Sequence, residues 1–227
     1  MDVDCRLVGA LEEQLRRRRA LLDGGATHVG WKLGMGGRER IGGTIAVGHL
    51  TSATAFASGA RVEIADGKLR ADAEVFVELG ARIDSGADAR AVAAAIRGYG
   101  PALELVDLAP LAGEPESIVA TNIFHRAVAF GDVRDAPPKG VEAAIFVNSE
   151  LREAAPAPED LPERLAQAAA VLAAVGERFD PRDRIITGSI VQVAFELGDE
   201  VVADFGIFGS VSLCVAEASA TVRAAGP

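Results

Sequence analysis

Cysteine, histidine and aromatic residues are scarce in this sequence, and each shortage excludes a class of protein. The 227 residues include two cysteines, Cys5 and Cys214, which are too few for a disulfide-stabilised secreted scaffold and fit a reducing compartment. The three histidines are far apart, and no two have the spacing of zinc ligands on a helix, so we expect each to be a surface or hydrogen-bonded residue. Aromatic residues make up 5% of the chain, so Ala, Val, Leu and Ile must form most of the core.

Excess positive charge and long apolar runs are also missing. The formal net charge is −10, which argues against a nucleic-acid partner, and the short basic run at residues 16–19 is typical of a solvated helix face. No apolar run approaches the length of a membrane span, and the acidic start at residues 1–4 is unlike a signal peptide. Ser189 lacks the context of a serine-hydrolase elbow, and Lys32 precedes its glycines, unlike the lysine of a phosphate loop. We therefore expect a cytoplasmic protein without a nucleic-acid or membrane partner.

The order of the predicted elements indicates an α+β fold. Apolar periodicity predicts helices at residues 6–22, 88–97 and 160–175, and Asp160 with Glu163 resembles a capping box that opens the last of them. Short strand-like segments lie between the helices in an irregular order, which predicts a curled, mixed sheet. We predict a helical lead-in at residues 1–26 and a main β-sheet domain at residues 27–227. The segment Ile41–Ala60 is rich in glycine and threonine, so we expect it at the surface, where it can form a lid.

Two acidic residues two positions apart mark the strand that we expect to carry the functional site. Residues i and i+2 of a strand point to the same face, so Asp72 and Glu74 converge. A third acid, Glu104, lies inside the apolar run 101–106, where a carboxylate is costly unless a cation satisfies it. These acids predict a divalent-cation site, with Mg²⁺ as the simplest occupant because it prefers oxygen ligands and keeps exchangeable waters. The alternative is a solvated polar face on an antiparallel strand.

Lys32 is the candidate catalytic residue. It lies between Trp31 and Leu33, directly before the glycine-rich turn at residues 34–37. A lysine in such a strand is often a surface residue that buries its apolar stem. Close to three acids and a glycine turn, it can instead bind a substrate carboxylate or act as an acid or base. The sequence leaves both interpretations open.

Several segments together resemble one family, the 2-keto-4-pentenoate hydratases and 2-oxo-3-hexenedioate decarboxylases of the fumarylacetoacetate hydrolase superfamily. The similar segments occur in the family's order and cover most of the chain, at residues 30–34, 72–77, 101–107, 186–189, 198–199 and 206–212. The sequence departs from the family pattern at Asp72, where Glu is usual, and at Thr121, where Asp usually precedes Asn122. Residues 123–125 are bulkier than usual, and the turn after Lys32 carries no hydroxyl group. These departures point to a specialised member with a larger or less polar substrate.

The resemblance has implications for the cofactor, the fold and the assembly. It implies a Mg²⁺ or Mn²⁺ ion bound by Asp72, Glu74 and Glu104, with Lys32 at the same site and a small 2-oxo acid as substrate. It implies the superfamily's rolled, mixed β-sheet with a few flanking helices. It also implies a homo-oligomer, at least a dimer, which can associate with a pathway partner enzyme. Finally, it implies substrate contacts from Gly34, Met35, Asn122, Thr187, Gly206 and Ser210.

Three functional hypotheses follow. The favoured one is a metal-dependent lyase that hydrates a 2-hydroxy-2,4-dienoate to a 4-hydroxy-2-oxo acid in the breakdown of aromatic-derived compounds. The second is a 2-oxo acid decarboxylase or a C–C bond hydrolase on the same scaffold, because the metal and Lys32 serve all three reactions. The third is a repurposed or non-catalytic partner subunit. Thr121 and the altered turn favour this third hypothesis, whereas the retained acids and Lys32 argue against it.

Overall fold

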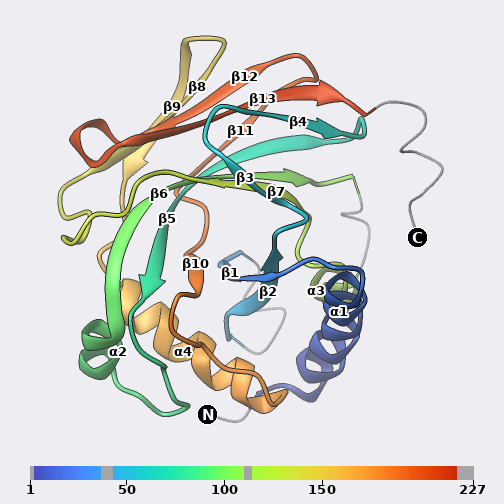
Figure 1. Cartoon of the computed structure of the whole chain (residues 1–227), viewed down its shortest axis with the longest axis vertical. Coiled ribbons are helices and arrows are strands. Elements are labelled where there is room, and N and C mark those ends of the chain that lie inside the picture. Colours follow the sequence, from blue (N-terminus) through green and yellow to red (C-terminus); the bar gives the residue numbers. More distant parts are fainter. Residues whose placement is uncertain (1–2, 37–42, 110–113, 219–227) are drawn as a thin grey trace.

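Two β-sheets form the framework of the fold, which we describe from a computed structural model at residues 3–36, 43–109 and 114–218. In Figure 1 the larger, curled sheet surrounds the centre of the view, and the smaller sheet lies across its top. Each sheet contains parallel and antiparallel strand pairs. The predicted α+β architecture with a rolled, mixed sheet is therefore confirmed.

The larger sheet has eight strands in the order β2-β1-β10-β5-β6-β7-β3, and β11 also pairs with β5. Its two longest strands, β5 and β6, lie side by side near the middle of this order and are buried along almost their whole length. The strands of this sheet are β1 (His28–Gly34), β2 (Ala46–Thr51), β3 (Ala55–Ala57), β5 (Leu69–Leu79), β6 (Ile96–Asp107), β7 (His125–Phe130), β10 (Arg184–Ile186) and β11 (Val191–Ala194).

The smaller sheet has five strands in the order β4-β13-β12-β8-β9 and packs on β5 and β6. The sequence did not predict β9, because its residues are nearly all exposed and show no apolar alternation. The strands are β4 (Ala60–Ile64), β8 (Glu142–Val147), β9 (Glu150–Pro156), β12 (Glu200–Asp204) and β13 (Ser210–Glu217).

Helices cover the larger sheet on the side away from the smaller one (Figure 1). They are α1 (Cys5–Asp23), α2 (Ala89–Ala95), α3 (Pro115–Ala120) and α4 (Leu161–Ala174), with a short 3₁₀ helix η2 at Gly206–Phe208. The buried apolar side chains of α1 belong to the same core as both sheets. None of the helices in the described part of the chain has the length and apolar character that a membrane crossing requires.

The expected helix caps are confirmed in one case and wrong in another. Asp88 accepts a hydrogen bond from the backbone N–H of Ala91, at 2.7 Å, and so caps α2. Asp160 makes no side-chain cap on α4, so the predicted capping box is wrong. Its carboxylate instead accepts a hydrogen bond from Nε of Arg164, at 2.9 Å, one turn along the helix.

The expectation that Ile41–Ala60 lies at the surface is wrong for residues 44–51, which are buried, whereas residues 52–53 and 57–59 are exposed. Residues 41 and 42 lie outside the described residues, but all six residues of β2 are buried. This strand lies between β1 and the covering helices α1 and α4. A strand covered on both faces has no polar alternation, which is why its pattern did not identify it.

Helix α4 packs its apolar face against α2 and β2. Leu161, Leu165, Ala168 and Leu172 are all buried, and their spacing of alternately four and three residues places them on one side of the helix. The predicted apolar stripe is confirmed for these four positions, and Val175, at the helix end, is partly buried.

Leu165→Ala should therefore lower the free energy of unfolding by about 2–5 kcal/mol, because Leu165 is fully buried and its loss leaves a cavity. Denaturant melts measure this change. Glu163→Ala, at an exposed position of the same helix, is the matched control and should change stability by less than about 0.5 kcal/mol. Equal effects of the two substitutions would contradict the packing role of this face.

Candidate metal centre and active site

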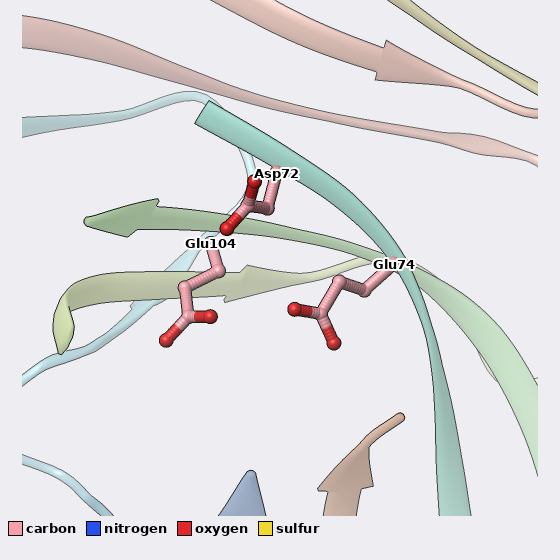
Figure 2. Close-up of side chains that lie close together, drawn as sticks. All are labelled: Asp72, Glu74 and Glu104. Atoms are coloured by element: carbon pink, nitrogen blue, oxygen red, sulfur yellow. The ribbon is translucent and has the colours of Figure 1, made fainter. Parts of the chain in front are cut away.

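Three carboxylates from β5 and β6 point toward one another inside the curled sheet (Figure 2). Asp72 and Glu74 lie two residues apart on β5, and Glu104 on β6 lies directly opposite Asp72 in the antiparallel register. One carboxylate oxygen of each residue lies within 4.8 Å of those of the other two. All three side chains are buried, with at most 4% of each residue exposed. The alternative of a solvated polar face is therefore wrong.

Burial and mutual repulsion shift the pKa values of these acids. Burial raises the pKa of Asp72 to about 6, and the nearby charge of Glu104 adds to this effect. The pKa of Glu74 is raised well above its ordinary value, first by burial and then by the charges of Glu104 and Asp72. Burial also acts to raise the pKa of Glu104, but Lys32 and His125 outweigh it and lower this pKa. Glu104 is therefore stabilised in its ionised form. Asp72 and Glu74 lack enough nearby positive charge to offset their burial and the repulsion among the three acids.

Each acid uses one oxygen for contacts within the protein. Oε1 of Glu104 accepts hydrogen bonds from Nζ of Lys32, at 2.5 Å, and from Nδ1 of His125, at 2.6 Å. Oε2 of Glu74 accepts a hydrogen bond from the backbone N–H of Gly188, at 2.7 Å. Such contacts fix the direction in which each carboxylate points.

Asp72 follows the same rule. Its Oδ1 accepts hydrogen bonds from the hydroxyl of Ser189, at 2.9 Å, and from the amide of Gln192, at 2.8 Å. Among the residues that the structure describes, no donor contacts the second oxygen of Asp72, Glu74 or Glu104. Three oxygens from three carboxylates are thus left to bind a ligand in the space between them.

This donor set fits a hard divalent cation. Carboxylate oxygens are the ligands that Mg²⁺ and Mn²⁺ prefer, and three of them leave room for waters or substrate oxygens in a six-coordinate shell. Three carboxylates beside the single ammonium of Lys32 leave an excess of two negative charges, which is the charge of one such ion. An ion there would also offset the burial and repulsion that raise the pKa values of Asp72 and Glu74.

Lys32 reaches this centre from β1 and is not a surface residue. Its side chain is buried, and Nζ donates hydrogen bonds to Glu104 and to the backbone carbonyl of Ile123, at 3.0 Å. Gly48 lies opposite Lys32 on β2, where a Cβ atom would come within 2.6 Å of Cγ of the lysine. Because Gly48 has no side chain, the space next to it is open for the side chain of Lys32.

A strained turn forms one wall of the site. Asn122, Ile123 and Phe124 all have positive φ, at 64°, 51° and 65°, and this conformation is especially unfavourable for the β-branched Ile123. The Asn122 side chain holds the turn against β2, because it accepts a hydrogen bond from the N–H of His49 and donates one to its carbonyl, at 2.8 and 3.0 Å. The strained turn thereby places the Ile123 carbonyl beside Lys32.

A cavity of about 340 Å³ opens from the three acids. Of the expected contact residues, Lys32, Gly34 and Met35 line it together with the acids. Ser189 and Gln192 also line it, although the sequence analysis gave them no role. Spacing along the sequence could not identify Ser189 and Gln192 as site residues, because they reach Asp72 only through the pairing of β11 with β5.

Four expected substrate contacts are not among the described residues that line the cavity. Asn122 acts on the backbone of β2, and the hydroxyl of the buried Thr187 donates to the carbonyl of Val75, at 2.8 Å. Gly206 and Ser210 belong to η2 and to β13 of the smaller sheet. Substrate contact by Asn122, Thr187, Gly206 and Ser210 therefore stays a prediction.

His125 is a buried neighbour of the centre that the sequence analysis treated only as a surface or hydrogen-bonded histidine. Because Nδ1 donates to the ionised Glu104, Nε2 accepts a hydrogen bond from the hydroxyl of Thr54, at 2.9 Å. Burial lowers the pKa of His125, which keeps the ring neutral. His125 therefore orients Glu104 without adding a charge to the site.

The curled sheet and its acidic centre define a fumarylacetoacetate hydrolase type of fold, as the sequence resemblance implied. No protein-family model matches the sequence, and no curated protein matches it. Solved structures do match, among them 4-oxalocrotonate decarboxylase from Pseudomonas putida G7 in a complex with magnesium and adipate. It has a TM-score of 0.81 and 23% identity, over 92% of this chain and 86% of that chain. The same enzyme in a complex with calcium and acetate has a TM-score of 0.80 and 23% identity, over 92% and 85% of the two chains.

More distant structures share the fold. A 5-carboxymethyl-2-hydroxymuconate delta-isomerase from Mycobacterium smegmatis has a TM-score of 0.66 and 16% identity, over 85% of this chain and 80% of that chain. A Yersinia pestis CO92 protein described as belonging to the fumarylacetoacetate hydrolase family has a TM-score of 0.63 and 16% identity, over 83% and 92% of the two chains. At these identities the similarity establishes a common fold.

Asp72→Asn should stabilise the metal-free protein above pH 6. The pKa of Asp72 rises from its ordinary value of 3.8 to about 6 in the folded state, so the parent loses stability as pH rises between these two values, and the full cost is present above about 6. An amide cannot ionise and avoids this cost. We expect a gain of about 1–3 kcal/mol at pH 7.5 and a smaller one at pH 5, from denaturant melts with a chelator.

Magnesium should reverse the order of stability, because the parent has three carboxylates for the ion and the variant has two. Glu63→Gln, at an exposed acid on β4, is the matched control and should show neither effect. A parent protein that melts identically with Mg²⁺ and with a chelator would contradict the metal assignment.

Asn122→Ala should destabilise the protein by about 1–3 kcal/mol, because two hydrogen bonds to β2 are lost while the left-handed turn remains costly. Asn122→Gly removes the same hydrogen bonds but tolerates the conformation, so it should cost less. Denaturant melts of both variants measure the difference. An alanine variant as stable as the parent would contradict the role of the Asn122 side chain in holding the turn on β2.

Proposed function

We propose that this chain is a divalent-metal-dependent lyase of the fumarylacetoacetate hydrolase superfamily that acts on a 2-oxo acid or its dienol. The preferred reaction is hydration of a 2-hydroxy-2,4-dienoate to a 4-hydroxy-2-oxo acid, in the breakdown of aromatic-derived compounds. The observation that carries the proposal is the convergence of Asp72, Glu74, Glu104 and Lys32 at the inner end of one cavity. Retention of this whole set argues against a non-catalytic partner subunit.

The proposed cofactor is Mg²⁺ or Mn²⁺, held by the free oxygens of Asp72, Glu74 and Glu104. When bound, such an ion supplies Lewis-acid chemistry toward the carboxylate and C2 carbonyl oxygens of a 2-oxo acid. The backbone N–H of Gly188 and the side chains of Ser189 and Gln192 hold the acids in place for this. No rearrangement of the site is then needed as substrate arrives.

Lys32 has the geometry to orient substrate and to move a proton. An ammonium group has three N–H donors, and Nζ of Lys32 uses two of them, for Glu104 and for the Ile123 carbonyl. The third is free to donate to a substrate carboxylate or to deliver a proton to carbon when dienol is converted to enone. We favour substrate orientation as its main role, with proton transfer as a second one.

A 2-oxo acid decarboxylase is the second candidate, because the fold matches 4-oxalocrotonate decarboxylase over most of both chains. C–C bond hydrolysis is a further alternative on this scaffold. An ultraviolet assay on a panel of 2-hydroxydienoates and 2-oxo-enedioates, with CO₂ release and the products measured in parallel, separates these reactions, because C–C hydrolysis alone yields two organic fragments. Water addition removes the conjugated chromophore without gas release, whereas decarboxylation releases CO₂.

We also propose a cytoplasmic homo-oligomer, at least a dimer, that can associate with a pathway partner enzyme. The exposed apolar side chains Leu151 and Ile207, the latter 99% exposed, support further contacts with protein. The free thiols of Cys5 and Cys214 fit a reducing compartment. Light scattering after size-exclusion chromatography tests the assembly.

Lys32→Met should reduce turnover of the true substrate by about 10²–10⁴-fold, because the variant keeps the apolar stem but loses the charge and the protons. The assay follows loss of dienoate absorbance. Mg²⁺ should still raise the melting temperature, since the three acids remain.

Lys139→Met, at an exposed lysine, is the matched control and should leave turnover unchanged. Full turnover by the Lys32 variant would make this residue structural and remove the catalytic part of the proposal.

A further inference from the structure

The cavity has two chemically different ends. The acids, Lys32, Ser189 and Gln192 form the polar end. The rest of the wall includes hydrocarbon side chains of β6, of the residue that follows it, of α3 and of the strained turn. They are Val106, Leu108, Pro115, Ile118, Ile123 and Phe124.

In the described part of the chain, no side chain at the apolar end carries a positive charge that could receive an anion. Among the described residues that line the cavity, Lys32 is the one cation, and it is bound to Glu104 and to the Ile123 carbonyl. Arg126 lies close in sequence but pairs with Asp107, at 3.1 Å, and is not part of the lining. A carboxylate placed against this wall would lose its hydration without gaining a partner, which is unfavourable.

We propose that the substrate is a monocarboxylic 2-oxo acid, or its dienol, whose chain beyond the oxo group ends in uncharged hydrocarbon. This proposal rests on the proposed function, because it assumes that the 2-oxo acid group lies at the polar end. The apolar wall then selects the remote end of the substrate, with Ile118 and Phe124 as specificity-determining residues. This preference for an uncharged end would distinguish the chain from the structurally similar decarboxylase. The complex of that enzyme contains adipate, a molecule with a carboxylate at each end.

The test compares two acids of equal length, 2-oxohexanoate and 2-oxohexanedioate, with pyruvate as a probe for the 2-oxo acid group alone. Calorimetry with Mg²⁺ present should show 2-oxohexanoate binding at least ~10-fold more tightly than 2-oxohexanedioate, as expected when one buried charge has no partner. Equal or tighter binding of the diacid would overturn the apolar-end proposal and leave the proposed function standing. Absence of Mg²⁺-dependent binding of all three acids would overturn both.

A charge placed on the wall gives the second arm of the test. Ile118→Lys should shift the preference toward 2-oxohexanedioate over 2-oxohexanoate by at least ~10-fold. Ser117→Lys adds the same charge to the exposed side of α3 and is the matched control. A stabilising response to Mg²⁺ confirms that each variant is folded. Equal shifts in both variants would reflect general attraction of the diacid and would overturn the role of Ile118.

Discussion

The burial of three carboxylates beside a single lysine is the constraint on which the rest of this structure depends. Carboxylates cannot be removed from water without donors or a cation, and here each receives protein donors on one oxygen only. The two long central strands hold Asp72, Glu74 and Glu104 in register, so the repulsion cannot relax by separating them. The fold thereby maintains an electrostatic deficit that a divalent cation would remove.

The surrounding elements keep this arrangement in place. Gln14 of α1 donates hydrogen bonds to the carbonyls of Val47 and Val119, at 3.1 and 2.7 Å, and so links α1, β2 and α3. Asn122 continues this link by holding the strained turn on β2. Left-handed conformations in three successive residues are unfavourable, and they persist because these contacts over-determine the backbone. The helices on this side therefore contribute to the geometry of the site as well as to the core.

The division of the cavity into polar and apolar ends follows from strand geometry. Glu104 and Val106 lie two residues apart on β6, so both face the same side of the sheet. The acid serves the centre, and the valine begins the hydrocarbon wall that α3 and the strained turn complete. One strand thus places a carboxylate of the acidic centre next to the beginning of the hydrocarbon wall.

The sequence by itself determined the features that depend on local periodicity. The two-residue spacing placed Asp72 and Glu74 on one face, an acid in an apolar strand identified Glu104, and the helical spacing identified the buried face of α4. The position of Lys32 before a glycine turn was a local signal as well, although its burial was not. These patterns work because neighbours on a strand or helix have fixed relative directions.

Only the tertiary structure decided which distant segments meet. It brought Ser189 and Gln192 to Asp72 and His125 to Glu104, and it placed Gly206 in η2 and Ser210 on β13 of the smaller sheet. It also buried β2 on both faces, which no alternation in its sequence could reveal. Pairing between strands far apart in the chain depends on the packing of the whole core. Local spacing carries no information about that packing.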